Sequence, residues 1–220
     1  MIPGRTKQWL VAIICIGVIS ACVLWTYHTQ FAAPKFNVAL HRGVGRVMAE
    51  ETSRLLGNHG KIVIIAMEFA KVPELRVQME EFKNALQQPG GITVKQTYNL
   101  ETENQPKYGL GSGLSGRRYV RIVNKNTNAA AIVSFVGAPH LTDDEIAQLN
   151  IKPKLIAETR SAAKLKPLFE KQVLHSAIVA RFEFPTPLKG KPRTPRDWFN
   201  QRFQVVTAAN ADSLPAASAE

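Results

Sequence analysis

Short apolar runs recur along the chain and are separated by amphipathic stretches. The runs are rich in β-branched residues, which is typical of strands that are covered on both faces of a sheet. They predict five strands, KIVIIAM (61–67), ITVKQTY (92–98), AAAIVSFV (129–136), KLIAE (154–158) and SAIVARF (176–182).

The stretches between these runs carry helix signals. After the first run, Pro73 opens a helix whose apolar residues form a single stripe at helical spacing, namely Leu75, Met79, Phe82 and Leu86. Each later stretch between strands is also expected to contain a helix. These helices begin near Ser115, at a capping box formed by Thr142 and Glu145, and at Pro167. A further helix over 44–56 leads into the first strand.

Strands that alternate with helices are usually parallel and joined by right-handed crossovers. The pattern therefore predicts an α/β fold, with a doubly wound, mostly parallel five-stranded sheet and helices on both faces. RFQVV (202–206) is a candidate for an additional edge strand.

The N-terminal segment 9–27 contains no charged residue, whereas Arg5 and Lys7 precede it. Nineteen helical residues span about 28 Å, close to the hydrocarbon thickness of a bilayer. The flanking cations place the N-terminus in the cytoplasm and the rest of the chain outside. We expect a single-pass anchor in the cell membrane and an extracytoplasmic (periplasmic) domain.

Two alternatives to an uncleaved anchor remain. Ile19-Ser20-Ala21-Cys22 resembles the lipobox of bacterial lipoproteins, in which the cysteine is lipidated, and a cleaved secretory signal is the other. Cys15 and Cys22 are the only cysteines, so the exported domain has neither a disulfide nor a cysteine nucleophile.

Composition shifts divide the chain into segments. The expected order is a cytoplasmic N-terminus (1–8), the transmembrane anchor (9–27), a linker (28–43), the extracytoplasmic α/β domain (44–184), a basic, proline-rich arm with the possible edge strand (185–206) and a disordered tail (207–220).

The chain is strongly basic, with 28 Lys and Arg against 17 Asp and Glu and a net charge of +11. Such a surface attracts anions. Because the domain is expected outside the cytoplasm, nucleic acid is not an expected partner. The excess charge is better explained by an anionic membrane or cell wall nearby.

Charged residues follow several of the predicted strands directly. In a doubly wound sheet, ligands bind beyond the carboxyl ends of the strands, where neighbouring connections diverge. We expect a ligand-binding rim there, formed by Glu68, Gly137, Glu158, Arg160 and Arg181. Alternatively, these charges only pair with one another where the sheet reaches solvent.

The segment GLGSGLSGRR (109–118) contains a G-x-G-x-x-G spacing. The spacing does not directly follow the first strand, as a dinucleotide fingerprint requires, so no cofactor is expected. An anion contact that involves Gly113, Arg117 and Arg118 remains possible. The five histidines show no metal-ligand spacing, and no nucleophile motif is present, so an enzyme is less expected than a binding protein.

The order of segments resembles a known family. KIVIIAMEF, GITVKQTYNL, RRYVRIVNKNTNAAAIVSFVGAP and KPKLIAE together resemble one lobe of the type I periplasmic binding proteins and related sugar-binding domains. The resemblance extends over roughly 60–183 and is generic. It implies a binding module for a polar or sugar-like small molecule, which as a single lobe would bind weakly or through a partner.

Two other functions stay open. The chain would be a structural or assembly component of a cell-envelope complex if the basic arm docks a protein partner. It would be an exported hydrolase if Glu68 and Glu158 approach each other across a cleft.

Overall fold

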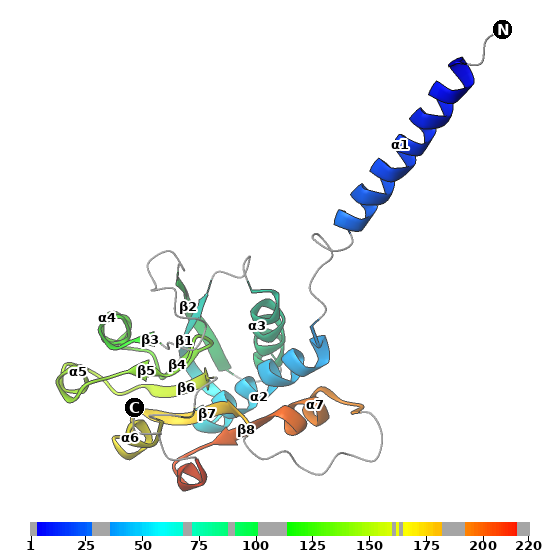
Figure 1. Cartoon of the computed structure of the whole chain (residues 1–220). Helices are drawn as coiled ribbons and strands as arrows, with labels where there is room; N and C mark the ends of the chain where they lie inside the picture. Colours follow the sequence, from blue (N-terminus) through cyan, green and yellow to red (C-terminus); the bar gives the residue numbers. More distant parts are fainter. Residues whose placement is uncertain are drawn as a thin grey trace. The chain divides into compact units, whose positions relative to one another are not determined.

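A computed structural model describes residues 4–27, 36–67, 72–87, 91–100, 114–159, 162, 165–181 and 192–214. The chain divides into two compact units, Met1–Phe36 and Asn37–Glu220. Figure 1 labels the helices and strands of both units.

The first unit contains the helix α1 (Gly4–Thr26). Among the described residues it is the one helix that is long and apolar enough to cross a membrane, and none of its candidate span is buried by protein. Its large apolar side chains are exposed, with Trp25 73% exposed. Exposed apolar surfaces of this size mark contacts with a membrane or with another protein.

The second unit is built around a six-stranded sheet in the order β2-β1-β4-β6-β7-β8. The first five strands pair in parallel, and β8 adds an antiparallel edge. This confirms the predicted fold class and the extra edge strand. The bounds are β1 His59–Met67, β2 Gly91–Leu100, β4 Ala131–Ser134, β6 Lys154–Thr159, β7 Leu174–Ala180 and β8 Phe203–Val206. A separate parallel pair joins β3 (Leu114–Ser115) to β5 (Pro139–His140).

The edge strand β2 changes face along its length. Its register with β1 shifts between the pairs Ile62–Val94 and Val63–Gln96, so Lys95 is an extra residue. A single extra residue reverses which side chains point to each face. Ile92 therefore joins the core on one face of the sheet, whereas Tyr98 packs against the core on the other.

The direction of each crossover decides which face its helix covers. The connection from β1 to β2 crosses the sheet in the opposite direction to the connections β2 to β4, β4 to β6 and β6 to β7. Because all four crossovers are right-handed, the helix of the first lies on one face and the helices of the other three lie on the other face. Figure 1 shows α3 on one side of the sheet and α4, α5 and α6 on the other. The bounds are α3 Pro73–Leu86, α4 Gly116–Lys125, α5 Asp143–Ala147 and α6 Leu165–Glu170.

Two helices outside the crossovers complete the face of α3. They are α2 (Val38–Leu56), which precedes the sheet, and α7 (Pro195–Arg202), which precedes β8. Glycines on α2 permit the close approach: a Cβ at Gly43 would collide with the backbone of Pro195, and one at Gly45 with the backbone of Gln78. The helix α2 therefore lies between α7 and α3.

The folded unit is longer than the predicted range 44–184. It begins at Asn37, whose side chain caps α2. In the basic arm, α7 buries Phe199 almost completely. Residues 207–214 differ from the predicted disordered tail, because they form a turn and the short helix η4 (Ala211–Ser213), with Ala211 buried.

Candidate functional site

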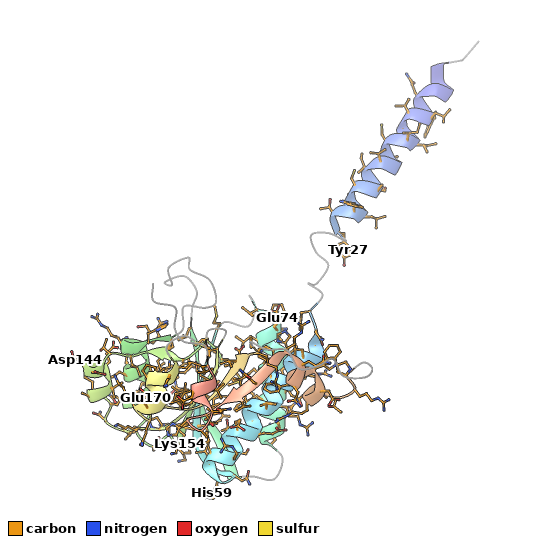
Figure 2. All side chains as sticks on the ribbon, turned by 60° about the horizontal axis from the view of Figure 1, so that its bottom comes forward. Tyr27, His59, Glu74, Asp144, Lys154 and Glu170 are labelled. Carbon is orange, nitrogen blue, oxygen red and sulfur yellow. The ribbon has the colours of Figure 1, made fainter. Side chains whose placement is uncertain are left out.

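The carboxyl ends of the strands meet at one edge of the sheet. There the chain leaves β1 toward α3 on one face, whereas it leaves β4 toward α5 on the other. This divergence marks the position at which ligands bind in open α/β sheets. Figure 2 shows Glu74 at this edge, at the opposite end of the domain from His59 and Lys154.

A pocket of about 180 Å³ lies at this edge. Strands β1, β4, β6 and β7 contribute their last residues or the residues that follow, while α2, α3 and β8 close the sides. The described lining consists of His41, Met67, Val72, Glu74, Leu75, Gln78, Phe135, Val136, Gly137, Glu158, Thr159, Ala180 and Phe203.

The loop after β4 forms one wall of the pocket. The buried Ser134 hydroxyl donates to the carbonyl of Gly137 at 2.6 Å and accepts from the backbone N–H of Val136 at 3.4 Å. Gly137 has φ 108°, a conformation that favours glycine. Phe135 is 4% exposed and meets Phe82 edge to face at 5.4 Å between ring centroids. The loop is thus held by its own hydrogen bonds and by the core.

The opposite wall joins α2 to α3 through one polar contact. The amide nitrogen Nε2 of Gln78 lies 3.1 Å from Nδ1 of His41. Gln78 is only 5% exposed, yet its Oε1 atom has no hydrogen-bond partner among the described residues. Buried polar atoms are nearly always paired, because an unpaired one loses its hydration without compensation. The Oε1 atom is itself buried, so this amide end is unpaired inside the wall.

The charged groups of the described lining are the carboxylates of Glu74 and Glu158, and no Lys or Arg belongs to it. The described part of the lining thus contains carboxylates, although the whole chain has a net charge of +11. No group of three or more His, Cys, Asp or Glu among the described residues could hold a metal ion.

The structure places the five predicted rim residues differently. Gly137 and Glu158 both line the pocket. Glu68 and Arg160 lie outside the described residues, and so does the spacing of the proposed carboxylate pair. Arg181 is not in the described lining: its Nε donates to the carbonyl of Asn200 at 2.6 Å, and its backbone N–H donates to that of Arg202. It ties the end of β7 to the end of α7.

The residues predicted to contact an anion, as far as the structure describes them, lie outside the pocket. Gly113 is outside the described residues, while Arg117 is exposed and Arg118 half-buried in the first turn of α4, and neither lines the pocket. The carboxylate of Glu145 already lies against Gly116 at this helix start. An anion contact by these arginines stays a prediction.

Three polar lining residues on α2 and α3 escaped the sequence analysis, namely His41, Glu74 and Gln78. A signal existed for Gln78, because it interrupts the apolar stripe of α3 between Leu75 and Met79 and is therefore a polar residue on a buried face. No pattern marked His41, because its place in the wall depends on how α2 packs against α3.

Comparison with solved structures finds the same fold in several proteins, among them sugar-binding proteins. The arabinose-binding protein AraP from Geobacillus stearothermophilus matches 80% of this chain with a TM-score of 0.54 at 17% identity. A solute-binding protein of an ABC transporter from Burkholderia graminis, in complex with D-arabinose, matches 79% with a TM-score of 0.53 at 18% identity. The XylFII-LytSN complex matches 77% with a TM-score of 0.51 at 13% identity.

At these identities the likeness shows the fold alone, which is that of the periplasmic binding proteins, as the sequence resemblance implied. The chain spans less than two thirds of the length of these neighbours, at 63%, 62% and 60%. No protein-family model and no curated protein matches the sequence.

Proposed function

We propose that the chain is an extracytoplasmic binding module that captures a polar small molecule in the pocket at the carboxyl ends of its strands. One observation carries this proposal: a pocket of about 180 Å³ lies at the carboxyl ends of the strands, at the point where the connections of β1 and β4 diverge. Ligands bind at this position in open α/β sheets.

The structural neighbours support a binding role. Two of the proteins named above bind arabinose by name or hold it in their structures, and a third is solved with a partner protein. Because this chain spans under two thirds of their length, we propose that its pocket is one side of a site. A protein partner would supply the other side.

The exposed apolar surface of α1 supports attachment to a membrane, with the N-terminus cytoplasmic as Arg5 and Lys7 suggest. Lipidation at Cys22 is the alternative. The intact mass of the protein purified from membranes distinguishes the two: an N-terminal Met1 excludes cleavage before Cys22.

A thermal-shift screen of the full chain in detergent tests the binding role. The panel contains neutral sugars, amino sugars, diamines, amino acids and organic acids. A compound present at one hundred times its Kd stabilises the folded state by about 2.7 kcal/mol, which is several degrees in Tm. We expect one chemical class to raise Tm in this way.

Two variants locate the effect. Ala180→Trp adds bulk from an exposed lining residue and should abolish the shift, whereas Ser53→Trp fills a separate groove between α2 and α3 and should preserve it. The proposal is wrong if no class stabilises the protein, or if both variants respond as the unmodified chain does.

A further inference from the structure

We infer that the amino-terminal edge of the sheet binds an extended anionic polymer. This edge lies at the opposite end of the strands from the pocket, and Figure 2 shows His59 and Lys154 there. The inference therefore does not rest on the proposed function. It combines the charge of the segments that form the edge with the contacts that hold these segments together.

Five segments meet at this edge, because each of the parallel strands begins here. They are 57–61, 91–96, 124–131, 150–155 and 172–176. They contain no Asp, Glu or Arg, but they carry His59, His175 and five lysines. These five lysines, which we call the lysine cluster, are Lys61, Lys95, Lys125, Lys152 and Lys154. The residues 88–90 before β2 lie outside the described part of the chain, and their sequence Gln-Pro-Gly adds no charge.

Hydrogen bonds join the segments of β2, β1, β4 and β6. The backbone N–H of Ala130 donates to the carbonyl of Lys61 at 2.7 Å, and that of Lys154 donates to the carbonyl of Ala130 at 3.0 Å. Because neighbouring strands lie about 4.8 Å apart, the backbones of Lys61 and Lys154 are about 10 Å apart. The Nζ atom of Lys95 donates to Oδ1 of Asn128 at 2.6 Å, which ties β2 to the turn before β4.

The end of α4 joins the same edge. Asn124 donates from Nδ2 to the carbonyl of Gln148 at 2.8 Å, and its Oδ1 accepts from the backbone N–H of Asn150 at 2.9 Å. These bonds hold the last turn of α4 against the segment that leads into β6. Lys125 follows Asn124, and Lys152 lies two residues after Asn150, so the lysine cluster continues across this junction.

The charge of the lysine cluster is not used within the described part of the domain. All five lysines are exposed, and none of them forms an ion pair with a described residue. Other cations are paired, since Lys166 contacts Asp212 and Arg196 contacts Glu50. The carboxylate nearest along the chain is Glu170 at the end of α6, and it interacts with Lys166.

The composition of the cluster indicates the kind of anion that fits it. Arginine presents a planar fork that suits one anionic group in a fixed orientation, whereas lysine is a compact point charge on a flexible stem. Arginines occur throughout the chain, yet the cluster contains lysines alone. Separate point charges over several strands suit a flexible chain of anionic groups, which contacts several lysines at once.

Two features favour a polymer over a lipid surface. Among the described residues of this unit, the exposed large hydrophobic ones are Val38 and Val94, so the edge has little with which to enter a bilayer. The unit also begins at Asn37, and the 19 residues of α2 carry the chain about 28 Å from there to the amino-terminal edge. A chain attached through α1 thus enters the domain at the end remote from the lysine cluster.

The test measures binding by fluorescence anisotropy on the full chain in nanodiscs of neutral phosphatidylcholine. The probes are labelled long-chain polyphosphate and labelled poly-L-glutamate, which distinguish phosphate from carboxylate polymers. We expect at least one of them to bind. Five lysine contacts predict that its affinity falls by about a hundredfold between about 50 and 200 mM salt. Inorganic phosphate should not displace it at equal charge concentration, because a single group lacks the multiple contacts.

Two double variants locate the binding. Lys61→Gln with Lys154→Gln removes two charges from the lysine cluster and should weaken binding by about tenfold or more. Arg42→Gln with Arg76→Gln is the matched control, because it removes the same charge from exposed residues in the first turns of α2 and α3, at the other edge. The control should change affinity by less than about threefold.

The outcomes separate this inference from the proposed function. Ala180→Trp, which fills the pocket, should leave polymer binding unchanged. If neither polymer binds, or if both double variants weaken binding equally, the inference is wrong. It is also wrong if nanodiscs that contain phosphatidylglycerol, and not the polymers, slow hydrogen–deuterium exchange in 57–61 and 150–155, because the occupant is then a lipid surface.

Discussion

Phe82 shows how much stability one residue contributes on the face shared by α2, α3 and α7. Its side chain is fully buried and meets Phe135 edge to face. We expect Phe82→Ala to lower the free energy of unfolding by about 3–5 kcal/mol, because it leaves a cavity in a packed core. Denaturant titration measures this loss. The exposed neighbour serves as control, since Lys83→Ala should change stability by less than about 0.5 kcal/mol. A loss below about 1 kcal/mol for Phe82→Ala would contradict the packing.

His175 makes stability depend on pH. Burial, with a smaller contribution from the nearby Lys154, lowers the pKa of this half-buried imidazole below its ordinary value, and its Nδ1 accepts from the backbone N–H of Leu155 at 3.4 Å. The unfolded chain therefore binds the proton more readily than the folded one. The stabilisation is complete above about pH 6.5 and is lost as the pH falls through the folded pKa.

The variant His175→Asn tests this dependence, because its amide oxygen keeps an acceptor but does not titrate. We expect the Tm of the unmodified protein to fall more steeply than that of the variant between about pH 7 and 5. Parallel curves over this range would show that His175 does not contribute.

Local sequence patterns predicted which residues are buried where apolar residues recur at helical spacing. The stripe Leu75, Met79, Phe82 and Leu86 is buried as expected. Gly137 and Glu158 line the pocket because the carboxyl ends of parallel strands must share an edge. The role of Arg181 was not predictable, because its partner Asn200 lies on α7, and no periodic signal connects the two.

At the scale of elements, α2 depends on two glycines for its position between α3 and α7. Replacing an interior helical glycine by alanine normally stabilises a helix by about 0.5–1 kcal/mol. At Gly45 the new Cβ would collide with the backbone of Gln78, which cannot move without shifting α3. We expect Gly45→Ala to destabilise the domain by about 1–3 kcal/mol, as overpacking does. Arg42→Ala, an exposed control on α2, should be nearly neutral. Denaturant titration compares them, and a more stable Gly45→Ala would contradict the close approach.

The predicted strands and crossover helices were found, but the packing of α2 and α7 on the face of α3 and the bulge in β2 were not foreseen. Right-handed crossovers place a single crossover helix, α3, on this face of the sheet, so other segments must bury the rest of the face. The need follows from the topology, which is readable from the sequence. Which segments bury the rest of the face is not readable, because α2 and α7 lie outside the crossovers and the handedness rule does not assign them to a face. The bulge at Lys95 escaped for a similar reason, since it is defined by pairing with β1.

At the scale of the whole molecule, the domain needs its flanking helices. The core on the face of α3 includes Val44, Val47 and Met48 from α2 and Phe199 from α7. A fragment of residues 37–214 should unfold cooperatively, whereas 61–181 would expose this core and should not. Thermal melts followed by circular dichroism distinguish the two. A cooperative transition for 61–181 would show that α2 and α7 are accessories.

The central claim is that this molecule binds its ligand where the strands end. Hydrogen–deuterium exchange of the full chain, with and without the panel compound that gives the largest thermal shift, tests it directly. We expect slower exchange in 72–78, 134–137 and 158–159 when the compound is present, since these segments contain residues that line the pocket. Protection confined to the groove around His140–Thr142 and Pro167–Lys171, with none at the strand ends, would contradict it.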